Sequence, residues 1–511
     1  MIAILDFGSQ YSKIIARKIR EINVYCEVVP HTISLKEIKE KKFKGIILSG
    51  GPHSVFNPES PKCDKEIINS NMPLLGICYG MQLIAQELNG EVNAGKSQEY
   101  GSANLFIDNN FDLFEGLWLE MAIWMSHGDS VIRMPEGFQR IGHTESCSIA
   151  AMANPEKKIY GVQFHPEVTH TPKGKEIIFN FVAKICRCAP NWTSKSFIKS
   201  AIDDIQKTVK HDKVLCALSG GVDSTVVAAL MKKAIGNRLT CMFIDIGFMR
   251  FDEGKNIKEI FSKKFNINLV YIDAKDRFFN KIEGVTDPEE KRKKIGEEFI
   301  RVFEEESKKL QGDHKFLAQG TLYPDVIESA IGDVSKTAVT IKSHHNVGGL
   351  PENIDFTIIE PLRMLFKDEV RKVGSELGLP DEIINRQPFP GPGLAIRILG
   401  EVTRESVQTV QKADAILMEE IKKANLYKKL WQSFIVLLPI KTVGVQGDKR
   451  TYSQVAAIRA VKSEDAMTAN WAHLPYELLE KVSSRIINEV PQINRVVYDI
   501  SSKPPSTIEW E

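Results

Sequence analysis

Gly76-Ile-Cys78-Tyr-Gly80 follows an apolar, strand-like run at 74–77 and opens a helix-forming segment at 81–88. A nucleophile between two glycines at a strand-to-helix turn is typical of a nucleophile elbow. The glycines permit a tight, strained backbone, and the helix N-terminus favours the thiolate form of Cys78. The motif predicts an α/β sheet with Cys78 at the end of a strand. Taken alone, it is equally compatible with a buried cysteine beside a turn.

A second stretch, Tyr160-Gly-Val-Gln-Phe-His165-Pro-Glu167, supplies a base and an acid. His165 and Glu167 are two residues apart, so we expect both side chains to leave the same face of a strand. Pro166 excludes a central strand and places the pair at a strand end, where active sites of open parallel sheets lie. Together with Cys78, the pair predicts the Cys/His/acid arrangement of acyl-enzyme chemistry.

The alternation of short apolar runs and helix-periodic segments extends outward from these stretches. Runs at 2–6 and 45–48 are predicted strands, and a second alternating series begins at 214–218. Turn-forming residues after Cys188 and the helix-breaking run Arg386-Gln-Pro-Phe-Pro-Gly-Pro-Gly393 mark boundaries. We predict an α/β domain at 1–188, a linker at 189–195, a Rossmann-like α/β domain at 196–385 and a small α+β domain at 386–511.

A second glycine-containing turn, Leu218-Ser-Gly-Gly-Val-Asp-Ser-Thr225, lies between an apolar run and a helix-forming segment. Such a loop binds phosphate because glycines let backbone N–H groups approach oxygen, the helix N-terminus carries positive potential and hydroxyls add donors. No Lys-Ser/Thr pair follows the glycines, which excludes a Walker A loop. A purely structural turn is the alternative. The predicted phosphate-binding residues are Ser219, Gly220, Gly221, Val222, Asp223 and Ser224.

The overall composition constrains the class of ligand and the compartment. The net charge is +1 and 43% of the residues are hydrophobic, as in an ordinary globular protein. Because there is no global basic field, we expect small-molecule ligands held at local sites, and neither nucleic acid nor membrane as a partner. The first residues lack the regions of a signal peptide, and several of the eight cysteines lie in apolar runs. Both features predict a reducing, cytoplasmic location.

Residues 1–188 resemble the class I glutamine amidotransferases. The resemblance rests on the Cys78 and His165 stretches, on Ile4-Leu-Asp-Phe-Gly-Ser-Gln10 and on Ser49-Gly-Gly-Pro52. It implies that Cys78 is the nucleophile, that His165 is the base and then the acid, and that Glu167 orients His165. It further implies an oxyanion hole at the backbone of Gly51 and Tyr79, and glutamine binding by Gln82 and Ser126-His-Gly-Asp129.

The phosphate loop is similar to the motif of enzymes that cleave ATP between its α and β phosphates, and the resemblance implies that Asp223 faces Mg²⁺. NAD synthetase, asparagine synthetase and tRNA thiolases share this loop. Three more stretches distinguish between these enzyme families. They are Ala318-Gln-Gly-Thr-Leu-Tyr-Pro-Asp325, Lys342-Ser-His-His-Asn-Val-Gly-Gly-Leu350 and Lys503-Pro-Pro-Ser-Thr-Ile-Glu-Trp-Glu511. With them, the whole chain resembles the prokaryotic-type, glutamine-hydrolysing GMP synthetases.

This wider resemblance implies that ammonia from glutamine and ATP convert XMP into GMP, with release of pyrophosphate and AMP, in a homodimer joined through the third domain. Gln387 departs from the family pattern, which often has His there. On charge pattern alone, Arg292 would be an ordinary solvated residue. Another glutamine-dependent adenylating amidotransferase and an inactive scaffold are the alternatives. The implied ATP contacts are Lys342 and Lys367, and the implied XMP contacts are Arg292, Gln432, Arg495, Lys503, Ile508 and Glu509.

Overall fold

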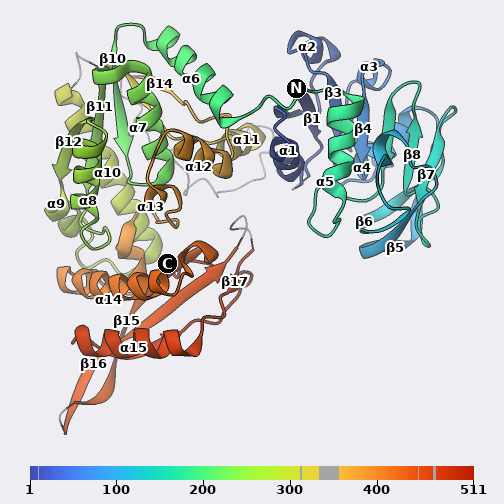
Figure 1. Ribbon diagram of the computed structural model, residues 1–511. Helices are drawn as coiled ribbons and strands as arrows, with labels where there is room; N and C mark the ends of the chain where they lie inside the picture. Colours follow the sequence, from blue (N-terminus) through green and yellow to red (C-terminus); the bar gives the residue numbers. More distant parts are fainter. Residues whose placement is uncertain (10, 311–313, 333–355, 447, 464–465, 467) are drawn as a thin grey trace. The chain divides into compact units, whose positions relative to one another are not determined.

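The computed structural model describes residues 1–9, 11–310, 314–332, 356–446, 448–463, 466 and 468–511. The chain divides into two compact units, Met1–Phe197 (unit 1) and Ile198–Glu511 (unit 2), shown in Figure 1. The α/β class predicted from the sequence is confirmed in both units. The predicted boundary at residue 386 lies inside unit 2 and stays a prediction.

Unit 1 is built on a nine-stranded sheet in the order β2-β1-β3-β4-β9-β8-β7-β5-β6. Its first five strands in this order are parallel: β2 (Cys26–Pro30), β1 (Ile2–Asp6), β3 (Gly45–Leu48), β4 (Leu74–Ile77) and β9 (Ile159–Val162). The strands β3, β4 and β9 are buried at every residue, as expected for parallel strands covered by helices on both faces.

Helices cover this parallel part of the sheet. α1 and α5 contact each other, and α4 packs on β4 and β9 (Figure 1). α2 begins with a capping box, in which the Ser34 hydroxyl accepts from the Glu37 N–H and the Glu37 side chain accepts from the Ser34 N–H. The helices of unit 1 are α1 (Ser12–Glu21), α2 (Leu35–Glu40), α3 (Lys65–Ile68), α4 (Tyr79–Glu87) and α5 (Gly174–Phe179).

The alternation of strands and helices expected up to residue 188 stops after α4. β5 to β9 follow one another without an α-helix at 91–162, a range that the structure describes completely. β5, β6, β7 and β8 pair antiparallel and extend the sheet beyond β9. Their bounds are β5 (Glu91–Ile107), β6 (Glu120–Arg133), β7 (Gln139–His143) and β8 (Ala151–Asn154).

Unit 2 contains a five-stranded sheet in the order β12-β11-β10-β13-β14, and all four pairings are parallel. This arrangement confirms the Rossmann-like prediction. The strands are β10 (Lys213–Leu218), β11 (Leu239–Asp245), β12 (Asn268–Asp273), β13 (His314–Ala318) and β14 (Thr357–Ile359). The helices are α6 (Ser194–Val209), α7 (Val222–Ile235), α8 (Glu253–Glu259), α9 (Lys275–Lys281), α10 (Pro288–Leu310), α11 (Tyr323–Gly332), α12 (Lys367–Glu376) and α13 (Asp381–Ile384).

The C-terminal part of unit 2 has a four-stranded sheet centred on β16, which pairs antiparallel with β15 and β17 and parallel with β18. α14 packs on β15, α15 packs on β18, and the two helices contact each other (Figure 1). Within the described ranges, no helix has the length and apolar character needed to cross a membrane. The bounds are α14 (Arg404–Lys423), β15 (Gln432–Gln446), β16 (Lys449–Lys462), β17 (Asn470–Trp471), α15 (Tyr476–Glu489) and β18 (Ile493–Tyr498).

Candidate active sites

Cys78 lies at the sharp turn between β4 and α4, with a backbone φ of 52°. The turn requires both glycines. A Cβ on Gly76 would lie 2.6 Å from the carbonyl carbon of Gly80, and a Cβ on Gly80 would lie 2.4 Å from the carbonyl oxygen of Leu48. Because a side chain at either position would collide with backbone, the local sequence forces the strained conformation that presents the thiol.

His165 and Glu167 are joined by a contact of 2.7 Å between Nδ1 and Oε1, and both side chains are buried. Burial lowers the pKa of His165, but the Glu167 carboxylate and the nearby Cys78 outweigh it, so the pKa lies well above its usual value. A carboxylate that binds Nδ1 fixes the imidazole tautomer needed for acid–base chemistry at Nε2.

The expectation that His165 and Glu167 share one face of a strand is wrong, because β9 ends at Val162. The two residues lie in the turn that follows. Thr171 stabilises this turn, since its hydroxyl donates to the carbonyl oxygen of His165 at 2.7 Å. The turn, rather than the two-residue period of a strand, brings imidazole and carboxylate together.

Gln163 belongs to this site, although the sequence reasoning did not select it. Its Nε2 donates to the Sγ of Cys78 at 3.6 Å, and its Oε1 accepts from Gln82 at 3.3 Å. Gln82 also donates to the carbonyl oxygen of Asp129 at 2.7 Å. Gln163 lies in the same short stretch as His165, but an amide carries none of the patterns that mark a nucleophile or a base.

The turn after β3, which contains Gly50 and Gly51, lies close to Cys78 and His165. A Cβ on Gly50 would lie 3.2 Å from Cε1 of His165 and 3.8 Å from Cβ of Cys78. A Cβ on Gly51 would lie 3.6 Å from Cγ of Tyr79. The backbone of the predicted oxyanion hole therefore lies beside the nucleophile, and its role stays a prediction.

The loop after β10 joins a strand to a helix N-terminus, as predicted, and its phosphate binding stays a prediction. Gly220 has a φ of 76°, and α7 begins at Val222, so the helix N-terminus opens toward the loop. The Oγ atoms of Ser219 and Ser224 are 3.2 Å apart, and the Gly221 N–H donates to Oγ of Ser219 at 3.3 Å. The loop is organised by its own hydroxyls and glycines.

The side chains of Asp223 and Lys367 are in contact in the fold of unit 2. Nζ of Lys367 donates to Oδ2 of Asp223 at 2.5 Å. The other carboxylate oxygen, Oδ1, is buried and accepts no hydrogen bond from a described residue. Arg386, which was not among the predicted ATP contacts, donates to the carbonyl oxygen of Gly220 at 2.5 Å. Lys342 lies outside the described residues.

Part of the predicted XMP set gathers at the C-terminal tail. Arg397 is fully buried and binds both carboxylate oxygens of Glu509, at 2.9 and 3.1 Å. Gln432 donates to Oε1 of Glu509 at 2.6 Å. Ile508 packs in the core with Phe434, which leaves little of it exposed. The sequence reasoning missed Arg397 because it follows an apolar segment without a motif.

The three remaining cations of that set have different surroundings. Arg292 donates to the terminal residue Glu511. Nζ of Lys503 donates to the carbonyl oxygen of Ala466 at 2.9 Å. Arg495 is exposed on β18, where its Nε lies 3.5 Å from the hydroxyl of Thr442. Arg292 contacts the tail that carries Glu509, and Lys503 lies within that tail. A common XMP site for all six residues stays a prediction.

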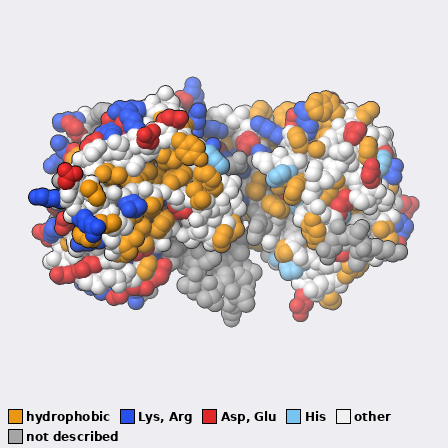
Figure 2. Space-filling view, turned by 90° about the horizontal axis from the view of Figure 1, so that it is seen from below, with side chains coloured by type: hydrophobic (Ala, Val, Ile, Leu, Met, Phe, Trp, Pro, Cys, Tyr) orange, Lys and Arg blue, Asp and Glu red, His pale blue; other side chains and the backbone are white. Residues whose placement is uncertain are grey.

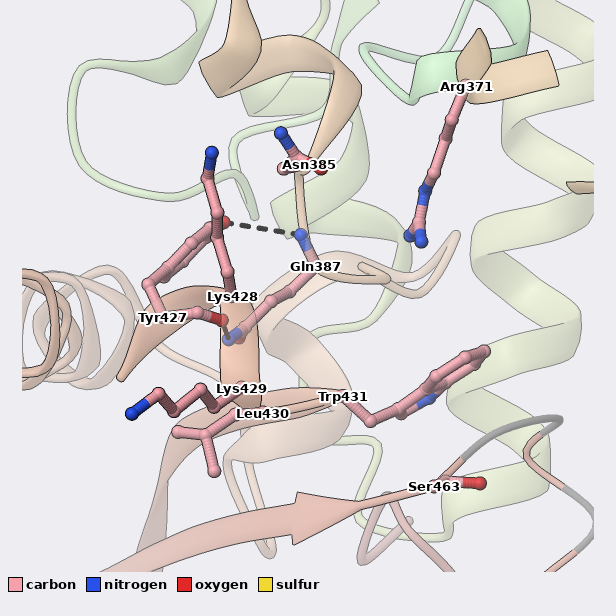
Figure 3. Close-up of a pocket in the computed structure, with 9 residues that line it drawn as sticks. All are labelled: Arg371, Asn385, Gln387, Tyr427, Lys428, Lys429, Leu430, Trp431 and Ser463. Atoms are coloured by element: carbon pink, nitrogen blue, oxygen red, sulfur yellow. Dashed lines mark hydrogen bonds between the residues drawn. The ribbon is translucent and has the colours of Figure 1, made fainter. Parts of the chain in front are cut away.

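Gln387, the departure from the family pattern, lines a cavity of about 250 Å³ in unit 2 (Figure 3). Its Nε2 donates to the carbonyl oxygen of Tyr427 at 3.2 Å, and its Oε1 accepts from the Ser433 N–H at 2.9 Å. Arg371 and Lys428 also line this cavity. The amide forms hydrogen bonds at both ends, as expected, and so joins α13 to β15.

Three family models match separate parts of the chain. Residues 3–185 match the family model "Glutamine amidotransferase class-I", residues 202–284 match "Asparagine synthase" and residues 419–510 match "GMP synthase C terminal domain". A solved structure from Thermoplasma acidophilum, described as one part of a putative GMP synthase, is 30% identical, with a TM-score of 0.34, and covers 40% of this chain and 96% of its own.

Full-length relatives extend these matches to the whole chain. The glutamine-hydrolyzing GMP synthase of Clostridium acetobutylicum is 57% identical over 100% of this chain and 99% of its own length. The enzyme of the same name from Thermosynechococcus vestitus is 57% identical over 100% of this chain and 96% of its own length. The chain therefore belongs to the family of glutamine-hydrolysing GMP synthases.

Proposed function

We propose that this chain hydrolyses glutamine at Cys78 and uses the ammonia, with ATP as co-substrate, to convert XMP into GMP. The observation that carries the proposal is full-length identity of 57% to glutamine-hydrolyzing GMP synthases, in a chain where Cys78, His165 and Glu167 lie together. The second α/β unit supplies the phosphate-binding loop that the ATP-dependent step requires.

The glutaminase reaction follows from the geometry around Cys78. The thiolate attacks the side-chain amide carbon of glutamine, and His165 donates a proton to the leaving ammonia. His165 then takes a proton from water as the water attacks the thioester, which releases glutamate and restores Cys78. Glu167 stabilises the imidazole whenever it is protonated, which agrees with the pKa of His165, since burial lowers it but Glu167 and Cys78 raise it well above its usual value.

In the second reaction, the C2 oxygen of XMP attacks the α-phosphate of ATP and pyrophosphate leaves. Ammonia then attacks C2 and displaces AMP to give GMP. The loop at Ser219, Gly221 and Ser224 binds pyrophosphate through N–H and hydroxyl groups at the α7 N-terminus. Asp223 fits a bound Mg²⁺, because its Oδ1 is a buried, unpartnered acceptor. Mg²⁺ would neutralise the negative charge that develops on pyrophosphate.

The proposed XMP site is built around Glu509. Its carboxylate is oriented by Arg397 and Gln432, so it presents a fixed acceptor to the N–H groups of a purine. Arg292 and Lys503 are the cations that we assign to the 5′-phosphate. Both now donate to backbone carbonyl oxygens, and we expect XMP to replace these contacts.

The variants Cys78→Ala and Asp223→Asn test the two half-reactions separately. Cys78→Ala should abolish GMP formation from glutamine and leave formation from added ammonium intact. Asp223→Asn should abolish both, because adenylation is common to both nitrogen sources. Cys63→Ala is the matched control, since Cys63 is another buried thiol of unit 1, and it should retain both activities. Loss of ammonium-dependent activity in Cys78→Ala would contradict the two-site proposal.

The main alternative is another glutamine-dependent adenylating amidotransferase. An assay of ATP-dependent AMP release with XMP and with other acceptor classes separates the two, since only XMP should support turnover. We also propose a cytoplasmic location, which the eight cysteines support because no disulfide joins any of them in the described structure.

We further propose that the protein is a homodimer joined through the C-terminal sheet. The hairpin of β15 and β16 exposes Val443, Val445 and Tyr452, and Val443 pairs directly with Tyr452. Figure 2, which looks at the molecule from below the view of Figure 1, shows hydrophobic side chains gathered on this face of unit 2. An exposed apolar surface of this kind marks an interaction site.

A further inference from the structure

Three potential metal ligands converge at the outer edge of the unit 1 sheet. Glu99 on β5 and His127 on β6 are directly paired across the strands, and Cys147 follows β7. The carboxylate, imidazole and thiol ligand atoms all lie within 4.8 Å of one another, and the Oε2 of Glu99 is 3.2 Å from the Nε2 of His127. His127 and Cys147 are buried, while the side chain of Glu99 is 17% exposed and leaves a path from solvent.

The imidazole of His127 directs its Nε2 at the carboxylate of Glu99. Its Nδ1 is 3.0 Å from the carbonyl oxygen of Asp129, which can only accept, so Nδ1 carries the hydrogen. Nε2 lies 3.2 Å from Oε2 of Glu99. In the neutral ring, the lone pair of Nε2 faces this carboxylate oxygen, an arrangement that a cation between them would stabilise.

Each of the three ligands is held by a neighbour, as in metal sites whose outer contacts orient the ligands. Asp129 orients His127, and the hydroxyl of Ser146 donates to Oε1 of Glu99. The Cys147 N–H donates to the hydroxyl of Thr144 at 2.9 Å, and the Thr144 N–H donates to the Cys147 carbonyl oxygen at 2.9 Å. These contacts fix the positions of all three ligands before a metal binds.

We propose that Glu99, His127 and Cys147 form a binding site for a thiophilic divalent cation, best matched by Zn²⁺. Zn²⁺ accepts this mixed set of S, N and O ligands at about 2.0–2.3 Å and leaves a fourth position for water. On binding, the S–H bond of Cys147 breaks, an S–metal bond forms and the proton leaves to solvent, without a change of oxidation state. The cluster does not include Cys78, His165 or Glu167, but His127 lies in the stretch expected to bind glutamine, and the carbonyl oxygen of Asp129 contacts both His127 and Gln82.

The test uses the reduced, full-length chain and Cd²⁺, whose bond to a thiolate absorbs in the ultraviolet, with Zn²⁺ as the competitor. We expect one Cd²⁺ per chain, displaced by Zn²⁺, and a melting temperature that rises with Zn²⁺ concentration. Cys147→Ser should remove the absorption band. Glu99→Gln, which keeps the thiol, should weaken binding by at least about tenfold.

Two control variants distinguish this site from the other thiols of unit 1. Cys78→Ala and Cys63→Ser should both retain the band, because neither residue belongs to the cluster. Melting of each variant without metal identifies a loss of binding that only reflects misfolding. A band that survives in Cys147→Ser, a band lost in Cys78→Ala, or no binding by the folded wild-type chain would overturn the proposal.

Discussion

The fold holds the backbone of Cys78 in an uncommon conformation and gives the buried imidazole of His165 an uncommon pKa. Cys78 has a positive φ in a turn packed so closely that a Cβ on Gly76 or Gly80 would collide with backbone atoms. His165 is buried and yet has a raised pKa, because Glu167 contributes a full negative charge at hydrogen-bonding distance. Backbone strain and buried charge of this kind gather at functional sites, where the surrounding structure sustains them.

Glu167→Gln should lower the pKa of His165, since the burial that opposes protonation remains while the main favourable charge is removed. A raised folded-state pKa stabilises the protein fully below the unfolded value of about 6.5, and this stabilisation is lost as pH rises through the folded value. The deficit in the variant's free energy of unfolding should therefore be largest in acid and shrink as pH rises.

Urea unfolding across a pH series from about 5 to about 9 measures this deficit. Glu156→Gln is the control, because Glu156 is an exposed carboxylate of the same unit. Its unfolding midpoints should follow those of the wild type at every pH. A deficit in Glu167→Gln that stays constant with pH would show that Glu167 supports the fold without acting on the charge of His165.

At the scale of elements, the tail after β18 is a structural part of unit 2. Three fully buried cations depend on it: Arg397 binds Glu509, Lys291 binds Glu511 at 2.6 Å, and Arg459 donates to the carbonyl oxygen of Thr507 at 2.9 Å. A terminal segment frays unless it is tied down, and these contacts tie this one down.

Deletion of 503–511 should abolish XMP adenylation and also destabilise unit 2. Removal of one partner from a buried ion pair typically lowers the free energy of unfolding by about 3–5 kcal/mol. The deletion removes the carboxylate partners of both Arg397 and Lys291. Hydrogen exchange should rise around α10, β15 and β16, while unit 1 keeps its protection. Protection equal to the wild type throughout unit 2 would contradict the structural role of the tail.

Lys503→Met separates ligand binding from stability within the same segment. Lys503 is half-buried and its ammonium contacts only one carbonyl oxygen among the described residues, so its loss should leave the melting temperature near that of the wild type. If Lys503 binds the XMP phosphate, the KM for XMP should rise at least about tenfold, equivalent to about 1.4 kcal/mol. An unchanged KM would remove Lys503 from the proposed XMP site.

At the scale of the whole molecule, each unit places its reactive groups after parallel strands. Cys78 follows β4, His165 follows β9, and the phosphate loop follows β10. The carboxyl ends of parallel strands are the usual position for ligands because helix N-termini and adaptable loops meet there. The same physical arrangement thus serves two different reactions in one chain.

Assembly also belongs to this scale. Val443→Glu combined with Val445→Glu should shift the protein from dimer to monomer in analytical ultracentrifugation, because charges would replace apolar side chains on the exposed hairpin. Leu119→Glu is the matched control, an equally exposed apolar residue of unit 1, and it should leave the dimer intact. A monomeric wild-type protein, or a dimer insensitive to the double change, would refute assembly through this surface.

The sequence by itself determined the parts that depend on neighbouring residues. The strand-to-helix turn at Cys78 and the loop at 219–224 could both be predicted, because apolar runs, glycines and helix N-termini act over a few residues. His165 and Glu167 were expected to lie together, and they do, but for a partly wrong reason, since a turn and not a strand joins them.

Only the tertiary structure decided which distant residues meet. The contact of Gln163 with Cys78, the contact of Arg397 with Glu509 and the cluster of Glu99 with Cys147 all join segments separated by dozens of residues. No local periodicity encodes these contacts, because they arise when packing of buried apolar surface brings separate elements together. Chemistry carried by a local motif can therefore be recognised from the chain, whereas the groups that orient it depend on the completed fold.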